Sequence, residues 1–587
     1  MYKKIENFHN ALLGENVFIF SDKDDPAAVN SILKDIYAKQ EAAQFGAERY
    51  SLYFLPGNYD ESIEVNIGFC MQAAGLGILP TDTTLPSLQC TARWLGDENN
   101  HKALCNFWRG VENLHLTRET MWAVSQATFM RRMKIDKTLY LHDEQGWASG
   151  GFLADSVVDD IIDCGPQQQW LNRNNRYKGW KDEHWNQVFV GDAKGCAPTE
   201  TWPEKAFTVV DTTPVVREKP FLIYEENIGF AVYVPKLRKE CAGESWREER
   251  NGKNCGKDSD VYGGMSDDAC GGKVIPLADF HVANPATDTA KTLNDALSLG
   301  KHLFFTPGIY KIEEPIRIER ADTIVLGTGL ATLIPTNGNA CMEAADADGI
   351  IISGLLFDAG SKNSSSLLVV GREKNNVNHA HNPICLSDLF FRVGGAPTEL
   401  PTMADVCLTI YSNDVVCDHF WLWRADHGTH VGWDKNIAKN GIIVYGDRAV
   451  LYALMVEHYM EYQTLFYGED IRLYMYQCEI PYDVPCQEVW MSRNGTRRGY
   501  ASIYVDDNVE RFQAYGLGVY LVNKDAPVIL ESAMEVPAKE NIEIHNICTV
   551  MLTPKPGIAH IINEEGDGVM EHLKRAVLCE YRGRMVR

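Results

Sequence analysis

The sequence lacks a long apolar run. A helix needs roughly 18 or more consecutive apolar residues to cross a membrane, and no stretch of the 587-residue chain approaches that. The first twenty residues, MYKKIENFHNALLGENVFIF, also lack the apolar segment and the small-residue cleavage site of a secretory signal. These absences predict no membrane partner and a cytoplasmic location, with a secreted mature form as the alternative.

Positive charge is scarce. Lys and Arg number 56 against 80 Asp and Glu, so the net charge is 56 − 80 = −24. A surface this acidic repels nucleic acids and anionic membranes, and it makes a polyanionic substrate unfavourable. The net charge does not exclude neutral partners, such as uncharged oligosaccharides or polysaccharides.

Cofactor and metal motifs are missing as well. The chain has no GxxxxGK[ST] phosphate loop, no HExxH, no GxSxG and no GxGxxG between a strand and a helix. We therefore expect no cofactor and no metal. The 16 cysteines form no CxxC pair, which predicts mostly reduced, buried thiols. Cys241, Cys255 and Cys270 share a polar loop, where free thiols are favoured over a disulfide or a metal because zinc ligands are spaced more tightly.

The first informative feature of the sequence is an internal repeat. Residues 51–59 read SLYFLPGNY and residues 302–310 read HLFFTPGIY. Pro56 and Pro307 are 307 − 56 = 251 residues apart. Similar Ile- and Val-rich runs and a Gly-containing turn follow each copy. The chain therefore contains two copies of one unit.

Each unit is rich in short strand-like runs that end in Gly, Asn or Asp. Many of these runs lie about 20–25 residues apart, as in the stacked coils of a β-solenoid. Helical periodicity is confined to residues 25–45 and 289–300, each just before its Pro-Gly motif. We predict an all-β fold of two tandem parallel β-helices with short capping helices. A β-sandwich or a propeller is the alternative.

The predicted boundaries follow from composition. Residues 1–235 form the N-terminal β-helix, and residues 276–587 form the C-terminal one. Residues 236–275 are polar and Gly-rich and lack strand patterning, so they are interpreted as the linker or loop between them.

Paired carboxylates point to glycosidic chemistry. Hydrolysis of a glycosidic bond needs a protonated carboxyl to assist the leaving oxygen and a second group to attack or to activate water. Residues 456–483 are rich in acids and tyrosines, and they place Glu457 and Glu479 22 residues apart. On adjacent coils of that length the two side chains would stack roughly 5 Å apart, and one pKa would rise. Ion-paired glutamates on a solvated face are the alternative.

Several segments resemble glycoside hydrolase family 55, whose members are β-1,3-glucanases built from two tandem right-handed parallel β-helices. The similar segments span about residues 15–565 and include WAVSQATFMRRMKI (122–135), ASGGFLADS (148–156), QQQWLNRN (167–174), FWLWRADHGTHVGW (420–433), VEHYMEYQ (456–463) and YQCEIPYDVPCQ (476–487). The resemblance implies the fold, a neutral β-1,3-glucan substrate and an inverting mechanism in a pocket between the two helices.

The resemblance also implies roles for individual positions. Glu479 matches the general acid and Glu457 a glutamate of the network that holds the attacking water. Gln126 and Ser149, from the first β-helix, match polar residues that complete that network. Two stacked glutamates would by separation alone favour retention instead of inversion, so the stereochemistry stays open.

Candidate substrate contacts are acids that accept sugar hydroxyls and aromatic rings that stack on sugar faces. Asp426 is the acid, with a turn residue paired to Arg424 as the alternative. The aromatic candidates are Trp122, Trp433, Tyr459, Tyr462 and Tyr482. His458 follows Glu457 and should point to the opposite face of the strand, in a structural role.

The resulting prediction is a glycoside hydrolase acting on a neutral, β-1,3-linked glucan or its oligosaccharides. A hydrolase or lyase for another glycan and a non-catalytic carbohydrate-binding solenoid are the alternatives. Oligomeric state stays undetermined, a monomer included.

Overall fold

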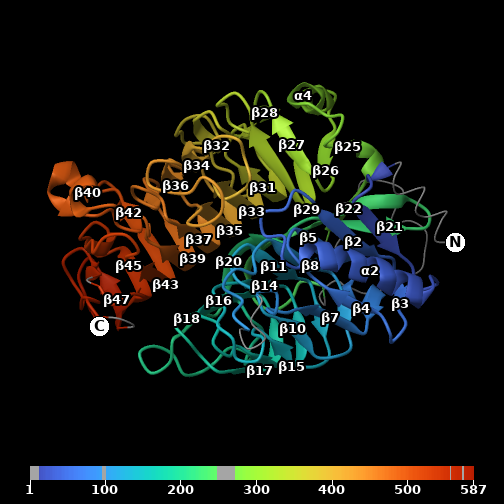
Figure 1. The fold of residues 1–587 in the computed structure, drawn as a ribbon, viewed down its shortest axis with the longest axis horizontal. Helices are drawn as coiled ribbons and strands as arrows, with labels where there is room; N and C mark the ends of the chain where they lie inside the picture. The colour runs from blue at the N-terminus through green and yellow to red at the C-terminus, as the bar shows by residue number, and fades with distance from the viewer. Residues whose placement is uncertain (1–11, 96–100, 247–271, 556, 572–573, 587) are drawn as a thin grey trace.

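Two parallel β-solenoids lie side by side in the computed structural model, one built from each half of the chain (Figure 1). The described residues are 12–95, 101–246, 272–555, 557–571 and 574–586. The all-β fold with tandem solenoids is confirmed. The right-handed winding stays a prediction, in line with the strong preference of parallel crossovers.

The N-terminal solenoid has two parallel sheets that wrap a common core. The first contains β1 (Val17–Phe20), β2 (Tyr50–Phe54), β5 (Met71–Gly75), β8 (Arg109–Glu112), β11 (Thr128–Arg131), β14 (Phe152–Ala154), β16 (Gln169–Arg173), β18 (Asn186–Val190) and β19 (Phe207–Val210). The second contains β3 (Gly57–Asn58), β4 (Glu64–Asn66), β6 (Thr83–Leu85), β7 (Ser87–Cys90), β9 (His115–Leu116), β10 (Thr120–Trp122), β12 (Lys134–Ile135), β13 (Leu139–Tyr140), β15 (Val157–Asp163) and β17 (Arg176–Lys181).

The C-terminal solenoid repeats this plan with longer strands. One sheet contains β25 (Phe280–Ala283), β26 (His302–Phe305), β27 (Ile309–Ile312), β29 (Ile324–Pro335), β31 (Ile351–Asp358), β33 (Cys385–Val393), β35 (Val416–Arg424), β37 (Val450–Glu457), β39 (Ile471–Glu479), β43 (Phe512–Leu521), β45 (Ile542–Met551) and β47 (Arg575–Arg582). The other contains β28 (Ile316–Ile318), β30 (Met342–Ala344), β32 (Ser364–Val370), β34 (Ala404–Ile410), β36 (Ala438–Val444), β38 (Thr464–Phe466), β42 (Ile503–Val505), β44 (Leu530–Glu535) and β46 (Ile558–Ile562). Within the described strands of these two sheets, all pairs are parallel except that of β45 with β47.

Residues with positive φ turn the chain at corresponding places on successive coils. In the first solenoid the residues directly after β8, β11, β14 and β16 are Asn113, Arg132, Asp155 and Asn174, with φ of 57°, 51°, 53° and 58°. Asn and Asp tolerate this left-handed conformation better than most side chains. Three of these four short strands therefore end where the sequence supplies Asn or Asp.

Both predicted helices are present. They are α2 (Pro26–Gln40), capped by the Asp25 carboxylate, and α4 (Ala290–Ser298), capped by the Thr289 hydroxyl. Residues 41–45 lie outside α2, so the predicted range 25–45 was too long. Each helix joins the first strand of its solenoid to the second, which confirms the internal repeat.

The segment that connects the solenoids forms antiparallel strand pairs. It pairs β20 (Thr213–Arg217) with β23 (Leu237–Cys241), and β21 (Phe221–Glu225) and β24 (Gly272–Pro276) with β22 (Gly229–Pro235). The prediction that residues 236–275 lack strands is therefore wrong at both ends. Cys241 has a free thiol that accepts a hydrogen bond from the Asn174 amide. Cys255 and Cys270 lie outside the described residues, so the predicted state of this group stays a prediction.

The solenoids meet across an apolar and ionic interface. Aromatic residues from both halves pack there, with the ring centres of Phe107 and Trp421 4.6 Å apart. Beside them, Arg131 donates to Asp388 at 2.8 Å and to Asp418 at 2.7 Å. All three side chains are buried. Salt bridges this well shielded from water leave the two solenoids little freedom to slide.

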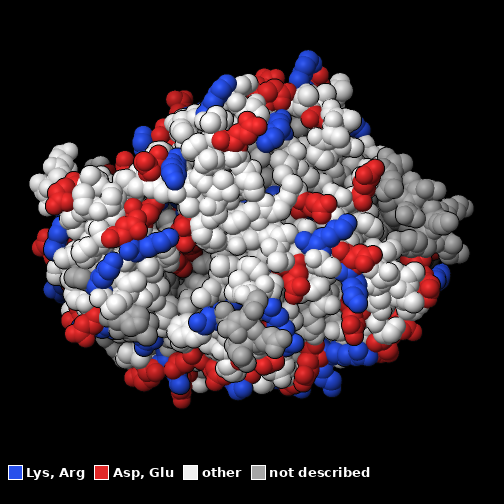
Figure 2. Space-filling model, in the orientation of Figure 1, with Lys and Arg blue, Asp and Glu red and all other residues white. Residues whose placement is uncertain are grey.

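The surface carries charges of both signs. Figure 2 shows acidic and basic side chains bordering a central area of this face that has few of either. Within the part of the chain that the structure describes, no helix has both the length and the hydropathy needed to cross a membrane.

Candidate active site

The two predicted acids stand side by side on neighbouring strands. Glu457 ends β37, Glu479 ends β39, and they are direct register partners. This confirms the placement expected from their spacing. Glu457 is 3% exposed, whereas the Glu479 side chain retains 16% exposure. Glu479 is therefore the carboxyl that a substrate can reach more easily.

The facing solenoid contributes the predicted polar partners. The Gln126 amide donates to Glu457 Oε1 at 2.8 Å and approaches Ser149 Oγ at 3.4 Å. Gln169, which the sequence did not single out, donates to Ser149 Oγ at 2.9 Å. Residues from both solenoids thus form one hydrogen-bonded group around Glu457.

Two glycines allow the turn at Ser149 to lie close to the hydrogen-bonded group around Glu457. Gly150 and Gly151 follow Ser149 with φ of +108° and +139°, a region that favours glycine. The Gly150 amide donates to the Gln167 side chain at 2.8 Å. A Cβ on Gly151 would lie 2.0 Å from the Trp170 ring. The turn that presents Ser149 therefore requires glycine.

Tyr482 contacts the acid directly. Its hydroxyl donates to Glu479 Oε2, and Gln477 donates to Glu479 Oε1 at 3.3 Å. Tyr482 was predicted as a sugar contact, and the structure places it beside the carboxyl that would meet the sugar.

Burial and charge set the protonation of the pair. Burial raises the pKa of Glu479 to about 7, the Tyr482 hydrogen bond opposes this rise, and repulsion from Asp426 adds to it. The pKa of Glu457 is raised well above its usual value by burial and then by repulsion from Glu479. A carboxyl that keeps its proton near neutral pH is what a general acid requires.

Asp426 is the fixed negative charge nearby. Burial alone would raise its pKa, but the hydrogen bond with His427 outweighs burial and lowers it to about 2. The pKa of His427 rises to about 10, because its bond to Asp426, 2.8 Å between Nδ1 and Oδ1, outweighs burial. The predicted alternative, a pair with Arg424, is wrong because Arg424 binds Asp483 at 2.7 Å.

Trp433 is a half-buried ring close to the Asp426 loop. The Arg424 guanidinium lies over its face at 5.8 Å, and the ring packs against the core of the C-terminal solenoid. Its predicted role in binding sugar stays a prediction.

Three other aromatic candidates lie elsewhere. Trp122 and Tyr459 are fully buried in the two solenoid cores, so the prediction that they stack on sugar is wrong. The Tyr462 hydroxyl donates to Glu535, and its ring packs on Tyr500 and Tyr504 instead of contacting Glu479. Strand periodicity does not distinguish an inward ring from an outward one when most positions are apolar.

His458 lies inside the acidic group, which corrects the prediction that it points away. Its φ is 67°, so alternation of side chains ends at this residue. The ring nitrogen Nε2 lies 4.0 Å from carboxyl oxygens of Asp426, Glu457 and Glu479. The sequence gives no signal for a left-handed histidine.

Aromatic residues flank the two acids in the same register row. Trp423 of β35 pairs with Glu457, and Tyr520 of β43 pairs with Glu479. Tyr520 packs on Trp185, with ring centres 5.2 Å apart. The row Trp423–Glu457–Glu479–Tyr520 thus places an acid pair between two apolar walls, which explains the strong burial of both carboxyls.

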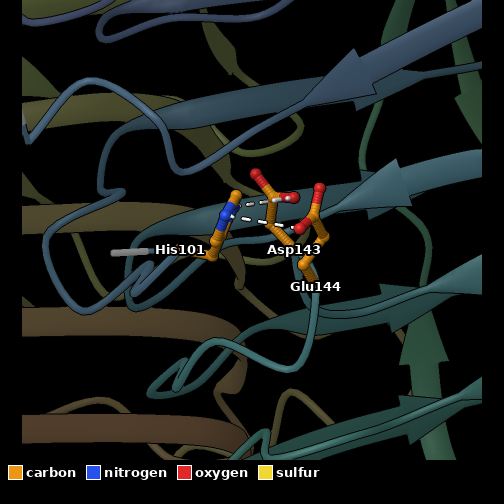
Figure 3. Close-up of side chains that lie close together, drawn as sticks. All are labelled: His101, Asp143 and Glu144. Carbon is orange, nitrogen blue, oxygen red and sulfur yellow. Dashed lines mark ion pairs between the residues drawn. The ribbon is translucent and has the colours of Figure 1, made fainter. Parts of the chain in front are cut away.

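A second group of ionisable residues lies in the N-terminal solenoid. His101 approaches Asp143 at 3.3 Å and Glu144 at 3.4 Å (Figure 3). Their ligating atoms are close enough to hold a metal ion. Arg93, however, contacts Asp143 at 3.4 Å and Glu144 at 3.1 Å and supplies the positive charge that balances them. We interpret the group as an ion-pair cluster joining two loops.

Comparison with known proteins agrees with this architecture. The family model described as the LAM55 pectate lyase-like domain matches residues 280–479, which end at the proposed acid. The fold and the site therefore define a carbohydrate-active enzyme of the pectate-lyase-like solenoid class.

Full-length relatives give the family. A protein named exo-beta-1,3-glucanase from Streptomyces sp. (strain SirexAA-E / ActE) is 40% identical over 563 residues, 94% of this chain and 87% of that protein. The structure of sacteLam55A from Streptomyces sp. SirexAA-E superposes with a TM-score of 0.88 at 37% identity, covering 97% of this chain and 98% of that one. A variant of sacteLam55A in complex with glucose matches equally well. The chain belongs to this family, the Lam55 enzymes of glycoside hydrolase family 55.

Proposed function

We propose that the protein hydrolyses β-1,3-linked glucan or its oligosaccharides and that it removes sugar from a chain end. The observation that carries this proposal is the Glu457–Glu479 pair, joined to Gln126 across the solenoid interface. Support comes from the relative named exo-beta-1,3-glucanase. An uncharged substrate suits the acidic chain, whose net charge is −24.

Glu479 is the proposed general acid. With a pKa of about 7 it holds a proton near neutral pH. The Tyr482 hydroxyl orients Oε2, and the proton passes from the carboxyl to the glycosidic oxygen as the bond to the anomeric carbon breaks. Asp426 contributes by opposing ionisation of Glu479 and by offering a carboxylate to sugar hydroxyls.

The proposed attacking group is a water molecule held by the other solenoid. Gln126 and Ser149 supply an amide and a hydroxyl beside Glu457, which are suitable partners for a water. Attack from that side would invert the anomeric carbon, and the Glu457 carboxylate would take the proton that the water loses as it attacks. The spacing of adjacent strands by itself favours retention, so the anomer of the first product separates the two mechanisms.

The proposed pocket lies between the solenoids, because its acid comes from one and its water-binding groups from the other. We propose that Trp433 and Asp426 contact the sugar at the rim. No step of this mechanism uses a cofactor or a metal.

Hydrolysis of laminarin-type oligosaccharides tests the proposal. In Glu479→Gln we expect turnover to fall by about 10²–10⁴-fold, while the matched control Glu461→Gln, a partly exposed glutamate of the same segment, stays near the parent. Turnover within about tenfold of the parent in Glu479→Gln would contradict the role of the acid.

Two further readouts define the reaction. Proton NMR of the first product reports inversion or retention, and absorbance reports any unsaturated sugar. An unsaturated product would indicate a lyase, whereas binding with no product over days would indicate a carbohydrate-binding solenoid. A parallel series with β-1,4- and β-1,6-linked glucans tests the linkage.

A further inference from the structure

His458 has an uncommon position for a buried histidine. It is 2% exposed, directly follows Glu457 and has a φ of 67°. Its backbone is fixed on both sides, because its N–H donates to the Glu479 carbonyl at 2.8 Å and its carbonyl accepts from Arg424 at 3.1 Å. The ring is therefore held against the acid pair by more than its own packing.

The ring's hydrogen bonds define which nitrogen carries the proton. Nδ1 lies 3.3 Å from the Ile480 carbonyl oxygen, which can only accept. Nδ1 is therefore the protonated nitrogen. In a neutral ring, Nε2 is then a hydrogen-bond acceptor. The ring makes an edge-to-face contact with Tyr482, with ring centres 4.3 Å apart and ring planes at 61°.

Carboxyl groups of three residues lie at the same distance from Nε2. This nitrogen lies 4.0 Å from Asp426 Oδ1, from Glu457 Oε2 and from Glu479 Oε2. A lone pair repels an ionised carboxylate and attracts a protonated one. A neutral His458 thus favours the state in which a neighbouring glutamate keeps its proton.

We propose that His458 is a positioning residue of the proposed reaction: its neutral ring, with Nε2 as acceptor, holds the proton on Glu479 in the free enzyme. This inference rests on the function proposed above. It concerns a residue that touches the acid and not the substrate.

The groups around the ring favour its neutral form. Burial is the largest effect and lowers the pKa of His458, and the Arg424 guanidinium lowers it further. Asp426, the Ile480 carbonyl and Asp483 act in the opposite direction. Because Asp426 is already paired with His427 and Asp483 with Arg424, much of their negative charge is balanced elsewhere.

Replacement by asparagine tests this role. Asn tolerates the left-handed conformation, and its amide N–H groups can donate to a carboxylate. In His458→Asn we therefore expect the high-pH limb of the kcat/KM profile to shift to lower pH by about one pH unit or more. At pH 5, where Glu479 is protonated in either enzyme, kcat should stay within about threefold of the parent.

The control is His560→Asn, a histidine of β46 outside the site, which should leave the profile unchanged. A merely structural role for His458 predicts equal loss at every pH or no shift of the limb, and either result would overturn the proposal. If the parent protein hydrolyses none of the glucans tested, the proposed function is contradicted. If the parent is active but the profile of His458→Asn does not shift, only the role of His458 is contradicted.

A measurement on the parent protein is independent of how the variant folds. ¹⁵N NMR of histidine-labelled protein, with the signal assigned by its loss in His458→Asn or by its contact with Ile480, reports the protonation of each ring nitrogen. We expect a neutral ring protonated at Nδ1 from pH 5 to pH 8. An imidazolium signal for His458 in that range would overturn the proposal.

Discussion

Glu479, the proposed general acid, is held in an environment that favours its protonated form at a cost in stability. Its pKa of about 7 in the folded protein compares with an ordinary value of 4.5. The folded state therefore binds the proton more tightly than the unfolded state, so stability falls as pH rises from about 4.5 towards 7 and stays reduced above that. The buried, ionised carboxyl costs at most about 3 kcal/mol there.

Glu479→Gln should therefore stabilise the protein, and more at high pH. We expect its gain in Tm over the parent to be larger at pH 8 than at pH 5, where the parent's carboxyl is already neutral. Scanning calorimetry at the two pH values measures this. An equal gain at both would mean that Glu479 ionises normally.

Some residues of the candidate site can be predicted from the sequence and others cannot, because prediction depends on the length of the coil between them. Glu457 and Glu479 were found because one short coil separates them, 22 residues along the chain. Trp423 and Tyr520 occupy the same row but lie on coils of 457 − 423 = 34 and 520 − 479 = 41 residues. Loops of unequal length hide such partners from any fixed period. His458 was missed because its φ cannot be inferred from its neighbours.

The turn that leads into β14 shows how much an element depends on one small residue. Gly151 has a φ of +139°, and an added Cβ would overlap the Trp170 ring. Gly195 has a φ of +83° and open space around it. The two positions share backbone strain but differ in packing.

Gly151→Ala should therefore destabilise the protein by about 1–3 kcal/mol more than Gly195→Ala. It should also lower glucan hydrolysis, because Ser149 would move with the turn. Urea unfolding and initial rates measure both effects. Equal unfolding free energies for the two variants would show that the Trp170 contact is unimportant.

Short strands, capping helices and the repeat were predictable because each depends on local pattern. Strand β23 was not, since its charged residues Arg238, Lys239 and Glu240 resemble a loop. Pairing with β20 overrides that local preference, as tertiary context often does for strands.

The whole molecule acts as one unit because the solenoids share buried charges. Besides its bonds to Asp388 and Asp418, Arg131 shares Asp418 with Arg173, whose guanidinium donates to it at 2.9 Å. Removing one partner of such a network leaves a buried charge without compensation. The alignment of Gln126 with Glu457 across the same interface depends on this register.

Arg131→Leu should therefore cost about 3–5 kcal/mol and reduce turnover. Lys291→Leu, which breaks the exposed pair with Asp295 at 2.5 Å, should leave the free energy of unfolding nearly unchanged. Denaturant unfolding of both variants gives the comparison. Similar small losses would mean that the solenoids are held by apolar packing alone.

The dependence of Glu479→Gln on the leaving group tests the central claim most directly. A natural oligosaccharide needs a proton on its departing oxygen, whereas a dinitrophenyl β-glucoside does not. We predict that the substitution lowers hydrolysis of the oligosaccharide by about 10²–10⁴-fold and that of the activated glucoside by less than about tenfold. Equal losses on both substrates, or no loss on either, would contradict the assignment of Glu479 as the acid.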